Sequence, residues 1–388
     1  MSQLEPSERK RKTVINNVRV FDGGGLIEPR TVVIDGSVIG NNPDGADEIV
    51  DGQGGVLLPG LIDAHVHLHH EGHLRELARY GVTTALDMAT WPAEKMNGLR
   101  GKAGLPDVRS AGLPATAPGS MHTHILPLPD EALLSRPEEA ERFVEGRIAE
   151  GSDYIKLISD VPGPTQETLD ALVTAAHEKQ KMTVTHASAH LPFTMALEAK
   201  TDVITHSPLD KSISDEVVEQ MVADKIVSVP TLVMMREASK RPSLWAILGL
   251  LFKPSLLMAI WRAKGSSQGA HRYENARDSA TAMYRGGVPI LAGSDCHDEP
   301  NSPFEVKHGD SLHIELELLV EAGLSTVDAL RGATILPAHH FGLSDRGAIE
   351  EGKRADLVLL RDDPTKDIRA SRSIAHVWCG GNEFPISA

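Results

Sequence analysis

The sequence predicts a (β/α)8 barrel together with a small β domain built from both ends of the chain. Two observations support this prediction: short apolar runs alternate with helical patterns through the middle of the 388 residues, and strand-like segments lie near both ends. Eight strands that alternate with helices are typical of such a barrel. A doubly wound sheet is the alternative, but such folds often carry a glycine-rich phosphate loop, and the sequence contains neither a GxGxxG nor a Walker motif.

The β domain is predicted over residues 13–58 and 345–388. The segments TVINNVRVFD and TVVIDGSVI are rich in β-branched residues and are separated by glycine-containing turns, and ADLVLL and SIAHVWCGG repeat this pattern near the other end. We expect these strands to form one small β domain. Residues 1–12 are polar and mixed in charge, so we expect a disordered, solvated tail.

The barrel is predicted over residues 59–344. Helical patterns such as TQETLDALVTAAHEK separate most of its strands, and Gly81 and Gly287 come just before a strand, where a helix end favours glycine because positive φ costs it little. The eight predicted strands are LIDAHVH (61–67), VTTALDM (82–88), DVRSAG (107–112), DYIKLIS (153–159), MTVTHAS (182–188), DVITHS (202–207), IVSVP (226–230) and VPILAGSD (288–295).

Charge and cysteine content exclude several classes of protein. The chain has 39 basic and 54 acidic residues, hence a formal net charge of −15, which argues against nucleic acid as a partner. Cys296 and Cys379 are too few for a disulfide framework, and the N-terminus has no apolar leader segment, so we expect a cytoplasmic protein.

The longest apolar stretch runs from Leu244 to Trp261. Lys253 and Pro254 interrupt it, which leaves two segments too short to cross a bilayer of about 30 Å, so no integral membrane span is expected. We expect two short helices. They are compatible with a lid over a site, with an interface in a homo-oligomer, or with a surface that associates with membranes.

Polar residues stand at the ends of five predicted strands, where barrel enzymes carry their chemistry. An i, i+2 pair of histidines on a strand points to one side, so both imidazoles of the first strand can reach one cation. Imidazole and carboxylate ligands suit zinc or a similar divalent ion. The predicted metal-site residues are His65, His67, Lys156, His186, His206 and Asp295.

On the basis of these residues, the sequence resembles the amidohydrolase superfamily, in the branch of imidazolonepropionases, metal-dependent prolidases and ochratoxin-type amidases. The resemblance implies a (β/α)8 barrel with a β-sandwich formed by both termini, which agrees with the barrel and the β domain predicted above. It is highly specific for the superfamily and poorly specific for the substrate. The matching segments are PGLIDAHVHL (59–68), DYIKLI (153–158), TVTHA (183–187), ITHS (204–207), LAGSD (291–295) and GAIEEGKRADLVLL (347–360).

The resemblance also implies the roles of the metal-site residues. His65 and His67 would hold one metal, and His186 and His206 a second; Lys156 would be a carboxylated lysine that bridges them. Asp295 would bind the first metal or its water and would transfer the water proton. We expect one or two zinc ions for each chain, with manganese or iron as alternatives.

Substrate contacts are predicted on three further segments. His122 and His124 lie in GSMHTH, which resembles the position of a substrate-orienting histidine in this branch; either could be that residue. Arg236 could bind a substrate carboxylate, and His297 could contact the substrate.

The expected activity is metal-dependent hydrolysis of an amide or lactam bond in a fairly bulky apolar small molecule. Lactone or ester hydrolysis, decarboxylation or deamination on the same barrel, and a non-catalytic scaffold remain as alternatives.

Overall fold

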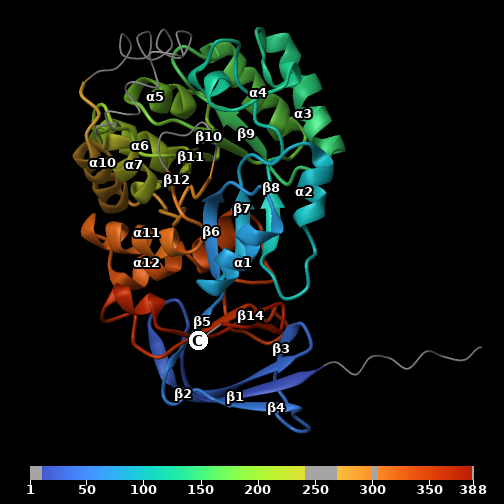
Figure 1. Cartoon of the computed structure of the whole chain (residues 1–388). Coiled ribbons are helices and arrows are strands. Elements are labelled where there is room, and N and C mark those ends of the chain that lie inside the picture. Colours follow the sequence, from blue (N-terminus) through green and yellow to red (C-terminus); the bar gives the residue numbers. More distant parts are fainter. Residues whose placement is uncertain (1–10, 241–268, 299–304, 387–388) are drawn as a thin grey trace, which may run out of the picture.

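The computed structural model describes residues 11–240, 269–298 and 305–386. Most of the predicted tail and all of the predicted helix pair at Leu244–Trp261 therefore lie outside the described residues. Strands from both ends of the chain lie together below the barrel (Figure 1). Within the three described ranges, no helix combines the length and the apolar character needed to cross a membrane.

The strands of the two chain ends form one continuous sheet. Its order is β15-β14-β13-β5-β1-β2-β3, and β4 pairs with β1. The sheet curls back on itself, so that its edge strand β3 meets the segment just before β13. There the N–H of Ile39 donates to the carbonyl of Lys353 (2.8 Å). These strands are β1 (Lys12–Phe21), β2 (Leu26–Asp35), β3 (Val38–Gly40), β4 (Glu48–Asp51), β5 (Val56–Pro59), β13 (Leu357–Leu360), β14 (Ile374–Cys379) and β15 (Asn382–Phe384).

The curled sheet has two apolar faces. On β5, Leu57 packs into a core inside the sheet that includes Trp378, whereas Val56 and Leu58 belong to the core shared with the barrel. The alternation follows from the period of two of a strand, and it explains why β5 is apolar at every position. The face of the sheet that carries Val56 and Leu58 thus packs against the barrel and fixes the β domain to it.

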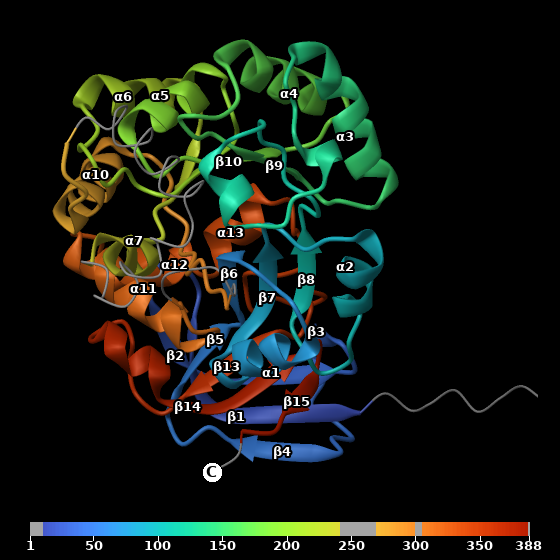
Figure 2. The ribbon, with the colours of Figure 1, turned by 45° about the horizontal axis from the view of Figure 1, so that its top comes forward.

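The barrel strands form two parallel sheets that isolated bridges join into a ring. β6, β7 and β8 form one sheet, seen side by side in Figure 2, and β9 to β12 form the other. Ala115 after β8 pairs with Leu157 of β9, which closes one gap. The strands are β6 (Leu61–Val66), β7 (Val82–Asp87), β8 (Asp107–Ser110), β9 (Ile155–Ile158), β10 (Thr183–His186), β11 (Val203–Thr205) and β12 (Val227–Val229).

The eighth predicted strand, residues 288–295, closes the other gap but is not a regular strand. Its residue Ile290 pairs with Ser228 of β12, and the following Cys296 pairs with Val66 of β6. A Cβ on Gly293 would lie 3.0 Å from the backbone nitrogen of His65, so only glycine allows this close approach. Asp295 has a φ of 54°, which ends the extended conformation.

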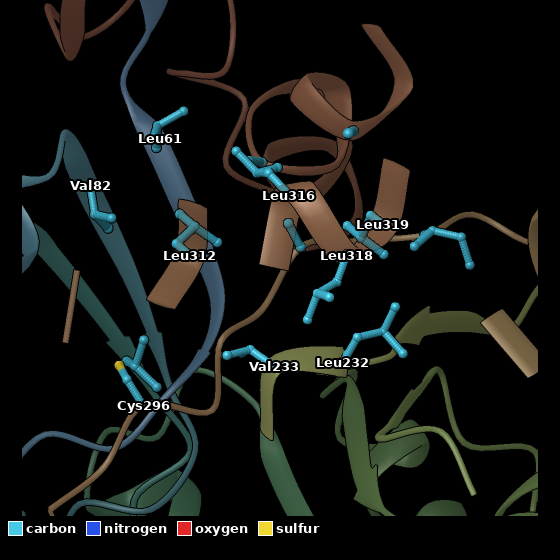
Figure 3. Packing of buried hydrophobic residues seen from close by; sticks show 14 of the residues in the cluster. Leu61, Val82, Leu232, Val233, Cys296, Leu312, Leu316, Leu318 and Leu319 are labelled. Atoms are coloured by element: carbon cyan, nitrogen blue, oxygen red, sulfur yellow. The ribbon is translucent and has the colours of Figure 1, made fainter. Parts of the chain in front are cut away.

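Helices surround the ring, as expected from the alternating pattern (Figure 2). Gly81 and Gly287 have φ values of 78° and 89°, which confirms their predicted role at helix ends. Leu232 and Val233 at the start of α7 pack near the leucines of α11 (Figure 3). The helices are α1 (Glu71–Arg79), α2 (Ala93–Leu99), α3 (Ala140–Ala149), α4 (Gln166–Glu178), α5 (His190–Glu198), α6 (Asp215–Ala223), α7 (Leu232–Ser239), α10 (Tyr273–Gly286), α11 (Asp310–Glu321), α12 (Thr326–Gly332) and α13 (Ile335–His340).

Candidate metal centre

The carboxyl ends of the barrel strands bring the six predicted metal-site residues around one cavity. The cavity measures about 220 Å³. Four of the six are almost fully buried, because their strands pack on all sides: His65, Lys156, His206 and Asp295 have exposed fractions between 1% and 4%. Residues far apart in the sequence thus meet because parallel strands end on the same side of the ring.

One group of ligand atoms is formed by His65, His67 and Asp295. The Nε2 atoms of the two histidines lie 3.3 and 3.0 Å from Oδ1 of Asp295. Four ligand atoms at about 2.1 Å from a tetrahedral zinc ion would lie about 3.4 Å from one another. The three side chains therefore already have the spacing of ligands around one ion.

A second group is formed by His122, Asp160 and His186, of which the two histidines line the same cavity. His122 Nδ1 lies 2.7 Å from Oδ2 of Asp160, and His186 Nε2 lies 3.9 Å from Oδ1. Each residue offers a ligand atom, and these atoms lie within 4.8 Å of one another. The rings of His122 and His186 meet edge to face, with centroids 4.4 Å apart.

His206 lies between the two groups, and Lys156 borders the same cavity. The His206 ring centroid is 5.0 Å from that of His65 and 4.4 Å from that of His186. Nδ1 of His206 makes a 2.6 Å hydrogen bond with Oγ1 of Thr231, and Lys156 Nζ donates to Oγ1 of Thr205 (3.1 Å). Both side chains are thus held in place from the neighbouring strands.

Burial controls the charge of these groups. It lowers the pKa of His65 and His186 well below the ordinary value and that of His206 to about 3, so all three imidazoles are neutral at neutral pH. Burial also lowers the pKa of Lys156 to about 7, against the opposing effect of Asp295. Burial alone would raise the pKa of Asp295, but His65, His206 and His67 hold it well below the usual range.

The donor set fits a divalent metal ion. Neutral imidazoles present a lone pair, and a carboxylate at the same point supplies negative charge. Among the described residues, His65 Nδ1 and His186 Nε2 are buried and have no hydrogen-bond partner. The atom of His65 that faces Asp295 is Nε2, and the fit to an ion rests on this spacing and on the chemistry of the donor set.

Asp63 braces the first group from inside the barrel. Its Oδ1 accepts the N–H groups of His65 (3.2 Å) and Ser294 (2.9 Å), and its Oδ2 accepts the Ser294 hydroxyl (2.6 Å). Burial raises the pKa of Asp63 to about 7. The side chain thereby joins β6 to the segment that carries Asp295, which fixes the spacing between His65 and Asp295.

The cavity has a polar side formed by the predicted ligands and an apolar side. His297 also borders it and is buried, with Nδ1 held 2.8 Å from the carbonyl of Asp295. The apolar side suits an apolar part of a small molecule. It is lined by Met88, Ala89, Pro114, Ile125, Leu126, Ile158 and Met234.

The structure separates the candidates that the sequence left open. His122 lines the cavity, whereas His124 is not among the described residues that line it. Arg236 lies on α7, but the described residue of α7 that reaches the cavity is Met234, two positions earlier. An α-helix turns by about 200° over two residues, so side chains at these positions point to different sides.

Two residues at the site were missed by the sequence analysis. Asp160 follows the lysine strand in the run IKLISD, so its place after a predicted strand was the available signal. Thr231 gave no signal, because its contact with His206 spans 25 positions of the chain.

The site just described lies within a part of the chain that matches a known protein family. A model of the amidohydrolase family matches residues 56–384, which include both groups of ligand atoms and the apolar lining. The chain therefore belongs to the amidohydrolase family, which is metal-dependent.

Two relatives illustrate how wide the family is. An adenine deaminase from Gluconobacter oxydans is 28% identical over 375 residues, which cover 90% of this chain and 55% of that protein. The chain thus spans about half the length of this relative. The ochratoxinase of Aspergillus niger is 24% identical over 402 residues, which cover 85% of this chain and 75% of the ochratoxinase.

The similarity to solved structures extends over nearly the whole chain. A Xaa-Pro dipeptidase with methionine bound in its active site superimposes with a TM-score of 0.79 at 23% identity, covering 96% of this chain and 99% of the dipeptidase. The A. niger ochratoxinase gives a TM-score of 0.73 at 20% identity, with 96% of each chain covered. At these identities the likeness establishes the barrel fold of the amidohydrolases and no particular substrate.

Proposed function

We propose that the protein is a metal-dependent hydrolase that cleaves an amide or lactam C–N bond in a small molecule with a fairly bulky apolar group. One observation carries the proposal: the six proposed metal-site residues and an apolar wall border the same cavity. The barrel, proposed over residues 59–344, contributes all of these residues. The β domain contributes none of them.

His65 and His67 are the proposed ligands of a first ion, and His186 and His206 those of a second. Lys156 borders the same cavity and has a pKa of about 7, so a good part of its amine is neutral at neutral pH. A neutral amine can take up carbon dioxide to form a carbamate, whose two oxygens can bridge two cations. We propose zinc, with manganese or iron as alternatives that fit the same ligands.

When bound, the ions supply a water molecule of lowered pKa and polarise the scissile carbonyl. Asp295 accepts the proton of the attacking water and donates it to the leaving nitrogen. Its pKa lies well below the usual range, so it is ionised at neutral pH. His122 presents its second ring nitrogen, Nε2, to the substrate and orients it, and His297 contacts the substrate beside Asp295.

The apolar wall favours amide or lactam bonds that carry an apolar group over small charged dipeptides. His124 and Arg236 are not part of the proposed site, because the described cavity lining does not include them. Lactones and other esters remain compatible substrates, since the same water attacks both kinds of carbonyl.

Deamination is the second candidate, and the adenine deaminase relative favours it. It uses the same activated water on a C–N bond, but ammonia leaves instead of an amine. The cavity argues against a purine. Apart from the proposed ligands and the two neighbouring histidines, its described lining is apolar and offers few partners for the ring nitrogens.

A hydrolysis screen of the zinc-loaded protein tests the proposal. The panel contains N-acyl amino acids with apolar groups, lactams, lactones and adenine, and product masses distinguish acid plus amine from ammonia release. Elemental analysis of the same sample should find one or two ions for each chain. Turnover that persists in metal-free protein would refute the metal-dependent mechanism.

A further inference from the structure

Asp160 is a buried carboxylate to which the proposed chemistry assigns no role. It follows β9 directly after Ser159 and is 8% exposed. Among the described residues, its two ion-pair contacts are with imidazoles that border the cavity, those of His122 and His186. The carboxylate thus contacts two imidazoles of the site at once, so its position suggests a task there.

The contact with His122 fixes the tautomer of that ring. Oδ2 of Asp160 lies 2.7 Å from His122 Nδ1 and also accepts the backbone N–H of His122 at 3.4 Å. A carboxylate oxygen accepts, so Nδ1 of His122 carries the proton. Nε2 is then the ring nitrogen left to act on a substrate in the cavity.

The contact with His186 uses the other oxygen of the same carboxylate. Oδ1 lies 3.9 Å from Nε2 of His186, a buried atom without a hydrogen-bond partner among the described residues. Histidines that bind metal ions almost always donate their second N–H to a carboxylate, a carbonyl or a water. A small shift of His186 toward Asp160 would make this bond and leave Nδ1 to an ion.

We infer that Asp160 is a positioning residue that orients the metal-binding imidazole of His186 and the substrate-facing imidazole of His122 together. This inference rests on the proposed function. It adds that one carboxylate sets the geometry of both a ligand of the second metal and the imidazole that faces the substrate.

Zinc affinity tests the inference without a substrate. Metal-free wild type, Asp160→Asn and Asp160→Ser are titrated with zinc against a chromophoric chelator. We expect both variants to bind one of the two zinc equivalents about 10- to 100-fold more weakly, as is typical when a carboxylate behind a histidine ligand is lost. Asp160→Glu retains the charge and should recover part of the affinity.

Glu383→Gln is the matched control. Glu383 also contacts a histidine, with His376 Nδ1 at 2.7 Å, but both residues lie in the β domain and outside the cavity lining. Its removal should leave zinc affinity unchanged. Absorption spectra of the cobalt-loaded proteins should change for Asp160→Asn and not for Glu383→Gln, because only the former alters a ligand's orientation.

Two outcomes separate the inference from the proposed function. If wild type binds no zinc, the metal-dependent function fails. If wild type binds zinc and both neutral Asp160 variants bind it as tightly, with unchanged cobalt spectra, Asp160 does not position His186. Urea unfolding of the same samples shows that the compared proteins are folded, and the two variants of different size keep the test independent of one substitution.

Discussion

Asp295 combines strain and charge at one residue. Its backbone φ of 54° is unusual for a residue other than glycine, and three histidine nitrogens lie 3.0–3.6 Å from its carboxylate oxygens. Such strain persists only where the surroundings impose it, and it is common at functional sites. The Asp63 hydrogen bonds to the preceding segment supply that constraint.

We expect Asp295→Asn to fold and to retain at least the second metal ion, but to lose nearly all turnover. Asparagine keeps the size of the side chain but cannot accept the water proton, and such losses typically cost about 10²–10⁴ in rate. Initial rates on any substrate found in the screen measure the effect. Near-normal turnover would reject Asp295 as the proton carrier and direct attention to His297 or Asp298.

Lys156 should be carboxylated, and Lys156→Ala should lose both metal and activity. Short-chain acids should restore part of the activity by replacing the carbamate. Metal content and turnover of the variant, with and without added acetate or formate, test this. Lys179→Ala is the control, because Lys179 lies at the surface and pairs with Glu145. A high-resolution electron density map with a free amine at Lys156 would contradict carboxylation.

At the scale of elements, the residues at the start of α7 contact both His206 and helix α11. Thr231 stands at the N-cap position with a φ of 48° and makes no side-chain cap bond; its hydroxyl is bonded to His206 instead. Glu315 of α11 caps this helix in place of Thr231. Its Oε1 and Oε2 accept the N–H groups of Leu232 (2.9 Å) and Val233 (2.7 Å).

Glu315→Leu should therefore destabilise the protein by about 2–5 kcal/mol, since each buried N–H left without an acceptor costs about 1–3 kcal/mol. Glu321→Leu on the same helix is the control, because Glu321 is exposed and surface changes usually stay within about 0.5 kcal/mol. Urea unfolding measures both. Equal stabilities of the two variants would show that the cap is dispensable.

We also expect the carboxyl of Glu315 to make the free energy of unfolding depend on pH. Burial raises the pKa of Glu315 to about 8, although the N–H groups of Val233 and Leu232 lower it. Between about pH 5 and 8 the folded chain keeps a proton that the unfolded chain has released, so this group makes the free energy of unfolding fall as pH rises. Glu315→Gln should flatten that slope in urea unfolding from about pH 5 to 8. Parallel curves for wild type and variant would contradict the raised pKa.

At the scale of the whole molecule, bound metal should act as a crosslink. The proposed ligands come from residues 65 to 295, and an ion bound to the folded chain alone raises stability in proportion to the logarithm of its concentration. We expect chelation to lower the melting temperature and zinc to restore it, as measured by calorimetry. The double variant His65→Ala/His67→Ala should respond less. A melting temperature unaffected by chelator would contradict a role of metal in stability.

The sequence by itself determined the alternation of strands and helices and the residues at the strand ends. Both are local patterns. A buried strand must be apolar, a helix end favours glycine, and His65, His67, Lys156, His186, His206 and Asp295 each follow or interrupt such a strand. Because parallel strands of a barrel end on one side, the order of these residues along the chain was enough to predict that they meet.

Only the tertiary structure decided which further groups join them. Asp160 reaches His122 across 38 positions, and the cavity includes His122 and Met234 but neither His124 nor Arg236. It also showed the eighth strand position as an irregular segment and the terminal strands as one curled sheet. These features depend on contacts between distant segments, whose packing sets where a loop side chain points, and no local pattern of residue types carries that information.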